Sequence, residues 1–157
     1  MQSALDLIYG RYCLTCDAPV TSLEALCPDC WRDTPFIHGL VCDKCGVPLP
    51  GEDAGTPEYC DDCLTLARPW DRGRAALVYR DNARRIVLTL KHGDRPDLAR
   101  PTADWMARVA RPIRQEGMIV APVPLHRMRL LFRLYNQSAV LSARVARLLD
   151  LSHCPDL

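Results

Sequence analysis

The fold is decided by residues 13–63, which hold four Cys-x-x-Cys pairs: Cys13-Leu-Thr-Cys16, Cys27-Pro-Asp-Cys30, Cys42-Asp-Lys-Cys45 and Cys60-Asp-Asp-Cys63. Two residues between the cysteines let the backbone turn tightly enough to point both sulfurs at one tetrahedral metal ion. Two pairs then complete a shell of four thiolates, so four pairs predict two metal sites. Soft thiolate ligands favour zinc, with iron a poorer second choice. Gly46 supplies the positive φ that such a turn often needs.

Other uses of these cysteines are less favoured. A disulfide framework needs an oxidising compartment, and the N-terminus has an acid at position 6 and no apolar run with a cleavage site. A thioredoxin-type redox pair belongs on a βαβ unit, which the cysteine-rich half does not resemble. Iron–sulfur binding is a minor alternative. We therefore expect two zinc ions, and we expect the isolated Cys154 to be a bystander thiol.

The order in which the pairs share a metal is left open by the gaps of 10, 11 and 14 residues between them. Sequential pairing puts Cys13, Cys16, Cys27 and Cys30 on one zinc and Cys42, Cys45, Cys60 and Cys63 on the other. Interleaved pairing, as in cross-braced modules, is sterically possible as well. We favour sequential pairing because each half is then a short ribbon of two knuckles. The metals would replace the core that so short a segment cannot build, with residues 51–57 as a loop inside the second ribbon.

Charge divides the 157-residue chain into two parts. Residues 1–70 carry four basic and eleven acidic side chains, a net charge of −7, whereas residues 71–157 carry sixteen and eight, a net charge of +8. Such asymmetry indicates two parts with different roles, so we predict domains at 1–70 and 71–157. The apolar stretch 118–124 is far short of the roughly 20 residues that span a bilayer. We therefore expect a cytoplasmic protein with no membrane contact.

The second half has the pattern of an α/β fold. We predict strands at 75–79 and 118–123, and a helix that begins at Asp81 or Asn82 and ends at Gly93. A second helix begins near residue 98, and Pro112 ends or kinks it. The last helix covers 136–150. The side chains predicted to face inward are Ala83, Ile86, Val87 and Leu90 in the first helix, Trp105, Met106, Val109 and Ile113 in the second, and Leu141, Val145, Leu148 and Leu149 in the third.

This half also looks incomplete. Two strands for three helices are too few, because a doubly wound sheet needs more strands to cover its helices. The sequence stops at Cys154-Pro-Asp-Leu157, directly after a helix, where another strand is expected. We therefore interpret the chain as a fragment or a truncated product.

The segment 124–137, between the second strand and the last helix, is where a ligand is expected. In open α/β sheets, ligands bind beyond the carboxyl ends of the strands, and a helix N-terminus attracts anions. Arg127, Arg129 and Arg133 add three guanidinium groups to this stretch, which suggests a phosphate or pyrophosphate site. The alternative is a solvated basic face or a surface for a nucleic-acid backbone.

These motifs, in this order, resemble the ComF/GntX family. The likeness is carried by the four cysteine pairs, Trp70-Asp71, Leu90-Lys-His-Gly93, Pro122-Val-Pro-Leu-His-Arg127 and Arg133-Leu-Tyr-Asn-Gln137, and it covers essentially the whole chain. Family members have an N-terminal double zinc ribbon and a type I phosphoribosyltransferase-like domain, and several are tied to DNA uptake in natural competence. The resemblance implies that 123–137 is the pyrophosphate-side loop, on which Arg127, Arg129, Arg133 and Asn136 fall.

Two departures from the family pattern limit what the resemblance implies. Leu134 replaces the family's glycine, which removes an easy positive φ, and Tyr135 conservatively replaces phenylalanine. The phosphoribosyl-diphosphate signature, an acidic pair followed by Thr-Thr-Gly, would lie beyond residue 157, and Asp61-Asp62 is inside the last cysteine pair. We therefore expect little or no transferase activity from these 157 residues alone.

Two functions follow as hypotheses, with no catalytic residue assigned. In the first, a phosphoribosyltransferase-family protein, of the glycosyltransferase class, uses phosphoribosyl diphosphate and Mg²⁺ when full-length, and this chain supplies the ribbons and a weak pyrophosphate site. In the second, a non-enzymatic zinc-ribbon module binds single-stranded nucleic acid, such as single-stranded DNA, or a protein partner, such as a competence protein. The acidic ribbon half favours a protein partner, and the basic half favours nucleic acid.

Overall fold

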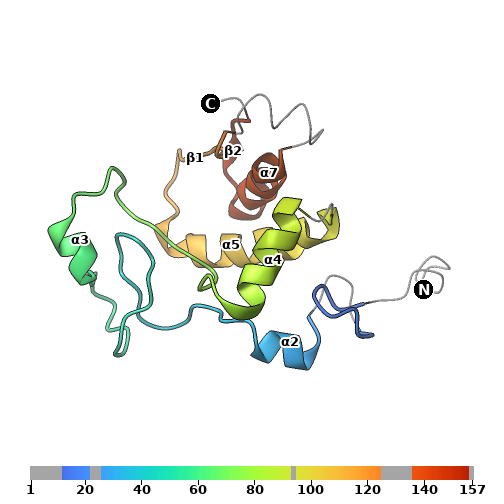
Figure 1. Cartoon of the computed structure of the whole chain (residues 1–157). Helices are drawn as coiled ribbons and strands as arrows, with labels where there is room; N and C mark the ends of the chain where they lie inside the picture. Colours follow the sequence, from blue (N-terminus) through green and yellow to red (C-terminus); the bar gives the residue numbers. More distant parts are fainter. Residues whose placement is uncertain (1–11, 22–25, 93–94, 125–135, 156–157) are drawn as a thin grey trace.

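The computed structural model describes residues 12–21, 26–92, 95–124 and 136–155. In chain order they form α2 (Pro28–Arg32), α3 (Asp61–Thr65), α4 (Asp81–His92), η1 (Pro96–Leu98), α5 (Ala99–Ala110), η2 (Arg111–Ile113), β1 (Ile119–Val120), α7 (Gln137–Leu149) and β2 (Ser152–His153). Figure 1 shows α4, α5 and α7 gathered together, with the cysteine-rich chain running away from them to α3 at its far end. The architecture is therefore a mixed helix-and-strand unit preceded by loops with little regular structure.

Helix α4 is amphipathic and buries one face. Ala83, Ile86 and Leu90 recur at helical spacing and are at most 8% exposed. Ile86 and Leu90 share a core cluster with Leu98, at the start of α5, and with Leu14 from the first cysteine pair. The predicted helix is confirmed, and a cysteine-rich loop supplies part of its core.

Helices α5 and α7 pack through small side chains. Ala103 and Ala107 lie against Val145 and Leu149 in a second core cluster, and the small alanines let the two helices approach closely. At the edge of this contact, Arg144 donates two hydrogen bonds to the Asp104 carboxylate, at 2.6 and 2.9 Å. Those hydrogen bonds outweigh the effect of burial and lower the pKa of Asp104.

The two short strands belong to a βαβ unit. Strand β1 pairs in parallel with β2, with Ile119 opposite Ser152 and Val120 opposite His153, and α7 lies between them in sequence. The Cys154 amide donates to the Val120 carbonyl at 2.9 Å and extends the ladder by one bond. This unit is the basic element of a parallel α/β sheet.

The strand predictions are wrong in extent. Residues 75–79 form only an isolated bridge, Phe36 with Leu77, because their partner is the short irregular segment after α2. Strand β1 covers 119–120 rather than 118–123, since β2 offers only two residues and Pro122 has no amide hydrogen to continue the ladder. Strand β2 (Ser152–His153) comes directly after α7, where another strand was expected.

Two of the predicted inward side chains are also wrong. Met106 is 40% exposed and Leu148 is 42% exposed. Each lies at the edge of a narrow buried stripe, which is set by the alanine contact between α5 and α7. The predicted end of the second helix near Pro112 is confirmed, because α5 gives way to η2 at Arg111. Of the helices that the structure describes, none is long and apolar enough to cross a membrane.

The alanine contact leads to a stability prediction. Ala103 is fully buried, so Ala103→Leu should overpack the contact and lower the free energy of unfolding by about 1–3 kcal/mol. The control Met106→Leu changes an exposed position on the same helix and should stay within about 0.5 kcal/mol of the parent. Urea unfolding of the zinc-loaded protein, followed by circular dichroism, measures both, and equal effects would contradict the packing described.

Candidate metal centres

The eight paired cysteines gather into two clusters. Site 1 consists of Cys13, Cys16, Cys27 and Cys30, and site 2 consists of Cys42, Cys45, Cys60 and Cys63. Within each site the sulfur atoms all lie within 4.8 Å of one another. The sequential pairing of Cys-x-x-Cys motifs is therefore confirmed.

The distances between sulfurs fit a metal ion and exclude a disulfide. The Sγ atoms of Cys16 and Cys27 are 3.6 Å apart, and those of Cys45 and Cys60 are 3.7 Å apart. A tetrahedral zinc with Zn–S bonds of about 2.3 Å requires sulfurs about 3.8 Å apart, whereas a disulfide bond is about 2.05 Å long. All nine cysteines are free thiols. Two sites of four thiol donors are consistent with two zinc ions.

The first cysteine pair of each site lies on a tight loop, and the two loops have the same backbone hydrogen-bond pattern. The amide of Cys13 donates to the Ala18 carbonyl at 2.7 Å, and that of Cys42 donates to the Val47 carbonyl at 2.8 Å. The residue after the second cysteine has a positive φ in both loops, +57° at Asp17 and +78° at Gly46. The predicted role of Gly46 is therefore confirmed, and an aspartate occupies the same conformation in the first loop.

The second pair of each site lies at the start of a short helix. Cys27 is the N-cap of α2 and Cys60 is the N-cap of α3. The Cys27 sulfur accepts a hydrogen bond from the Cys30 amide at 3.5 Å, and the Cys13 sulfur accepts one from the Cys27 amide at 3.3 Å. Amides at a helix start stabilise thiolates. Pro28 fits this place because the first helical position needs no amide donor.

The thiols of site 1 differ in their pKa. Burial raises the pKa of Cys13, but hydrogen bonds from Thr15 and from nearby backbone amides outweigh it and lower that pKa to about 5. A hydrogen bond from Thr15 lowers the pKa of Cys30, but burial and the neighbouring cysteines together raise it to about 12. One thiolate is therefore favoured by the protein, while a full set of four needs a cation to offset their mutual repulsion.

Site 2 shows the same division. Burial raises the pKa of Cys42, but hydrogen bonds from Cys60, Cys45 and Lys44 lower it to about 6. Burial and then the neighbouring cysteines raise the pKa of Cys45 to about 12, against a hydrogen bond from the Val47 amide. Both sites are therefore built to hold a dication among four thiolates.

Site 1 is joined to the helical half through side chains. Leu14, between two ligands, is 4% exposed and packs against Ile86 of α4. The Asn82 amide group donates to the Cys30 carbonyl at 3.2 Å and to the Thr34 hydroxyl at 2.8 Å. A ligand backbone and the start of α4 are thus fixed to each other.

Site 2 is joined to the following segment through close backbone contact. A Cβ at Gly46 would meet the Ala75 nitrogen at 2.9 Å, and a Cβ at Gly73 would meet the Lys44 carbonyl at 2.9 Å. Only glycine allows the loop of site 2 and residues 73–75 to approach so closely.

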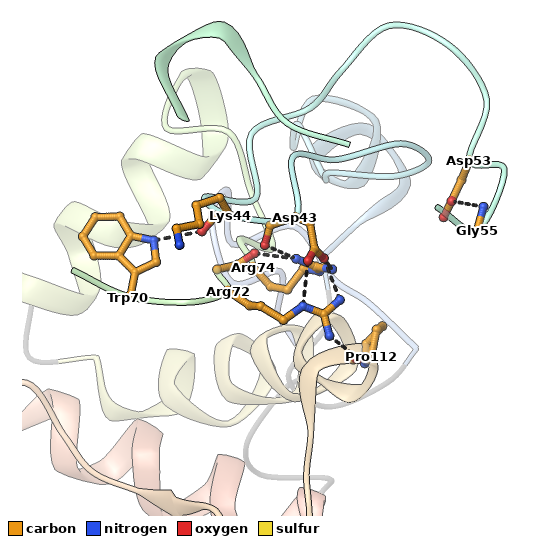
Figure 2. A network of polar contacts seen from close by, with 9 residues as sticks. Asp43, Lys44, Asp53, Gly55, Trp70, Arg72, Arg74 and Pro112 are labelled. Atoms are coloured by element: carbon orange, nitrogen blue, oxygen red, sulfur yellow. Dashed lines mark hydrogen bonds and ion pairs between the residues drawn. The ribbon is translucent and has the colours of Figure 1, made fainter. Parts of the chain in front are cut away.

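An ion network strengthens this contact (Figure 2). Asp43, inside the site 2 loop, accepts hydrogen bonds from Arg72 at 2.6 and 2.8 Å and from Arg74 at 2.5 Å. These bonds hold the pKa of Asp43 at about 2, against the effect of burial. Arg72 also donates to the Pro112 carbonyl at 3.3 Å, so the network reaches the end of the α5 region.

The predicted phosphate site is described only at its edge. Arg127, Arg129 and Arg133 lie outside the described residues. Asn136 is the N-cap of α7, and its side-chain oxygen accepts a hydrogen bond from the Ser138 amide at 3.0 Å. The phosphate role of all four residues stays a prediction. Cys154 is part of neither cysteine cluster.

The residues that join the two metal sites to the rest of the chain were not predicted from the sequence. Leu14, Asn82, Asp43, Arg72, Arg74 and Gly73 connect the sites to the rest of the chain. The pairing of the cysteines, in contrast, has a signal in the sequence. The first loop of each site has the pattern Cys-x-x-Cys-x-x-Pro, as Cys13-Leu-Thr-Cys-Asp-Ala-Pro19 and Cys42-Asp-Lys-Cys-Gly-Val-Pro48. That repeat equates Asp17 with Gly46 and indicates sequential pairing.

Comparison with known proteins agrees with this geometry. Residues 4–64 match the family model described as double zinc ribbon domain. Neither curated proteins nor solved structures gave a match to the chain.

Removing one ligand tests the assignment of the two sites. Cys27→Ser keeps a side chain that can cap α2 but removes a site 1 ligand, so native mass spectrometry should find one zinc instead of two. Cys60→Ser should do the same at site 2, and Cys154→Ser should retain two. Two zinc ions bound to Cys27→Ser, or one bound to Cys154→Ser, would contradict the assignment.

The close approach at Gly46 gives a second prediction. Gly46 and Gly55 share a φ of +78°, but a Cβ at Gly55 would meet nothing within 4 Å. Gly46→Ala should therefore weaken zinc binding at site 2 by about tenfold or more, since a loss of about 1.4 kcal/mol is tenfold. Gly55→Ala should change it by no more than about twofold. Gly73→Ala, at ordinary φ, isolates the contact from the backbone strain and should also weaken binding.

Competition with a chromogenic zinc chelator measures all three variants. Similar affinities for Gly46→Ala and Gly55→Ala would mean that backbone strain, and not contact with residues 73–75, explains the glycine.

Proposed function

We propose that this chain is a zinc-dependent docking module, a double zinc ribbon, joined to the N-terminal part of a phosphoribosyltransferase-like domain as in ComF proteins. The observation that carries the docking role is the closed ligand set of both sites. Four cysteines fill each tetrahedral shell, whereas a catalytic zinc keeps one position open for water or substrate. The metals therefore hold a surface in shape and take no part in chemistry.

The second half is supported as an α/β ligand-binding unit by its topology. Strands β1 and β2 pair in parallel around α7, and segment 124–137 follows the carboxyl end of β1 and runs to the start of α7. Ligands of such sheets bind at that place. Because the chain also resembles ComF proteins there, we assign this loop to the pyrophosphate of phosphoribosyl diphosphate.

The chemistry proposed for that half follows the resemblance to ComF proteins. Arg127, Arg129 and Arg133 would bind the pyrophosphate, and Asn136 would order the start of α7. Mg²⁺ and the phosphoribose would need carboxylates of the family's acidic-pair signature, which these 157 residues do not contain. A role in DNA uptake, as for several ComF proteins, follows from the resemblance.

A second candidate is the binding of single-stranded nucleic acid. Arg84, Arg85 and Lys91 are exposed on α4, and they could follow a phosphate backbone by charge alone. Arg85 lies beside the first ribbon, in a pocket that it shares with Cys30 and Arg32, so nucleic acid bound along α4 would also reach that edge of the ribbon.

Pyrophosphate binding distinguishes the two candidates. With pyrophosphate at ten times its Kd, mass action adds about 1.4 kcal/mol to the free energy of unfolding, and Tm should rise by about 3–6 °C. The rise should vanish in the double variant Arg127→Ala with Arg133→Ala. It should persist in the control Arg108→Ala with Arg147→Ala, which removes two exposed arginines of α5 and α7.

The opposite outcome has a clear signature. No shift with pyrophosphate, together with single-stranded DNA binding that weakens steeply with salt, would favour the second candidate. Loss of the pyrophosphate shift in the control variant would mean that general positive charge explains it.

A further inference from the structure

The far end of the second ribbon exposes a group of large apolar side chains. Leu64 is 69% exposed, Leu66 55%, Tyr59 45% and Trp70 45%. Helix α3, which carries Leu64, buries none of its residues. We name these four side chains and the segment 58–71 that carries them the ribbon tip; Figure 1 shows α3 at the end of the cysteine-rich half, away from α4 and α7.

Trp70 is held in a fixed position in the ribbon tip. Its indole Nε1 donates a hydrogen bond to the Lys44 carbonyl at 2.8 Å, inside the site 2 loop (Figure 2). The Arg68 guanidinium lies 5.7 Å from the centre of its ring, at cation–π distance. An aromatic side chain that is both exposed and already ordered loses little conformational entropy on binding. Tryptophan and tyrosine are also the side chains most enriched at binding hot spots.

The ribbon tip is acidic around its apolar side chains. Segment 58–71 carries Glu58, Asp61, Asp62 and Asp71 against a single arginine. Among the described residues, the ion pairs include none of these four carboxylates. Like-charge repulsion disfavours nucleic acids and anionic membranes at this surface, and it favours a partner with positive charge.

From this we propose that the ribbon tip binds a protein partner through an amphipathic helix whose apolar side chains are flanked by lysine or arginine. The proposal deepens the docking role given above and rests on it. Leu64, Leu66 and Trp70 would contact the apolar face of the helix, and Asp61 and Asp62 would pair with its flanking cations. Site 2 acts as the support, because it fixes both ends of the segment through Cys60, Cys63 and the bond to Lys44.

Binding of a synthetic probe tests the proposal. The probe is an 18-residue helical peptide with leucine at i, i+3, i+4 and i+7 spacing and lysine elsewhere, and fluorescence anisotropy on the zinc-loaded chain measures Kd. Leu64→Ser with Leu66→Ser should weaken binding about tenfold or more. The control Val140→Ser with Leu148→Ser removes two exposed apolar side chains from α7, at 45% and 42% exposure, and should leave Kd unchanged.

The charge contribution has its own pair of variants. Asp61→Asn with Asp62→Asn should weaken binding about threefold to tenfold and flatten its salt dependence. Glu52→Gln with Glu116→Gln, two exposed acids outside the ribbon tip, should have no effect. A peptide with glutamate in place of lysine should not bind, and neither should one with serine in place of leucine.

Each failure has a separate meaning. Equal loss of binding in the two apolar double variants, or equal binding of the serine peptide, would overturn the ribbon tip as the docking surface. Stronger binding to phosphatidylserine vesicles or single-stranded DNA than to the peptide, with the same loss in the Leu64 and Leu66 variant, would overturn the choice of partner. Native mass spectrometry should find two zinc ions in every variant, which shows that the ribbon is intact. If the ribbon stays folded after both zinc ions are removed, the proposed zinc-dependent docking module itself is refuted.

Discussion

Four thiolates that converge within 4.8 Å of one another repel strongly, and the structure of the N-terminal half depends on the cation that offsets this repulsion. The described part of this half has few buried apolar side chains. Between residues 12 and 66 they are Cys13, Leu14, Cys27 and Cys42. Three of the four are metal ligands. Structural zinc contributes about 10–16 kcal/mol in comparable peptides, as much as the whole stability of an ordinary domain. Metal binding therefore takes the place of a core.

The metal sites also hold the two halves of the chain together. Leu14 comes from the loop of site 1, yet it belongs to the core cluster of α4 and the start of α5. At site 2, the backbone of residues 73–75 lies against the loop, and Asp43 joins Arg72 and Arg74. The boundary predicted at residue 70 divides the acidic, cysteine-rich half from the basic half, but side chains and backbone of the two halves pack against each other across it. The ribbon tip lies at the far end of this half, where Leu64, Leu66 and Trp70 are exposed.

What could be predicted from the sequence was governed by local rules. The Cys-x-x-Cys spacing predicts the ligands, and apolar spacing predicts α4, α5 and α7, because both depend on neighbours within a few residues. The predictions that failed depended on contacts between residues far apart in the sequence. Residues 75–79 have strand composition, but in the part of the chain that the structure describes they pair only with Phe36 and its neighbours. Met106 and Leu148 fit an apolar helical pattern, but the alanine contact leaves them at its edge. The contacts of Asp43 with Arg72 and Arg74 join residues about thirty positions apart, which no local pattern indicates.

The central claim is that zinc supplies the core of the cysteine-rich half and supports α4 through Leu14. Hydrogen exchange with mass spectrometry, before and after zinc removal by a chelator, tests it most directly. The account predicts that residues 12–66 lose protection completely, that α4 loses part of its protection, and that the contact of α5 with α7 keeps most of it. Unchanged protection of residues 12–66 without zinc would contradict the account, and so would a uniform loss of protection along the whole chain.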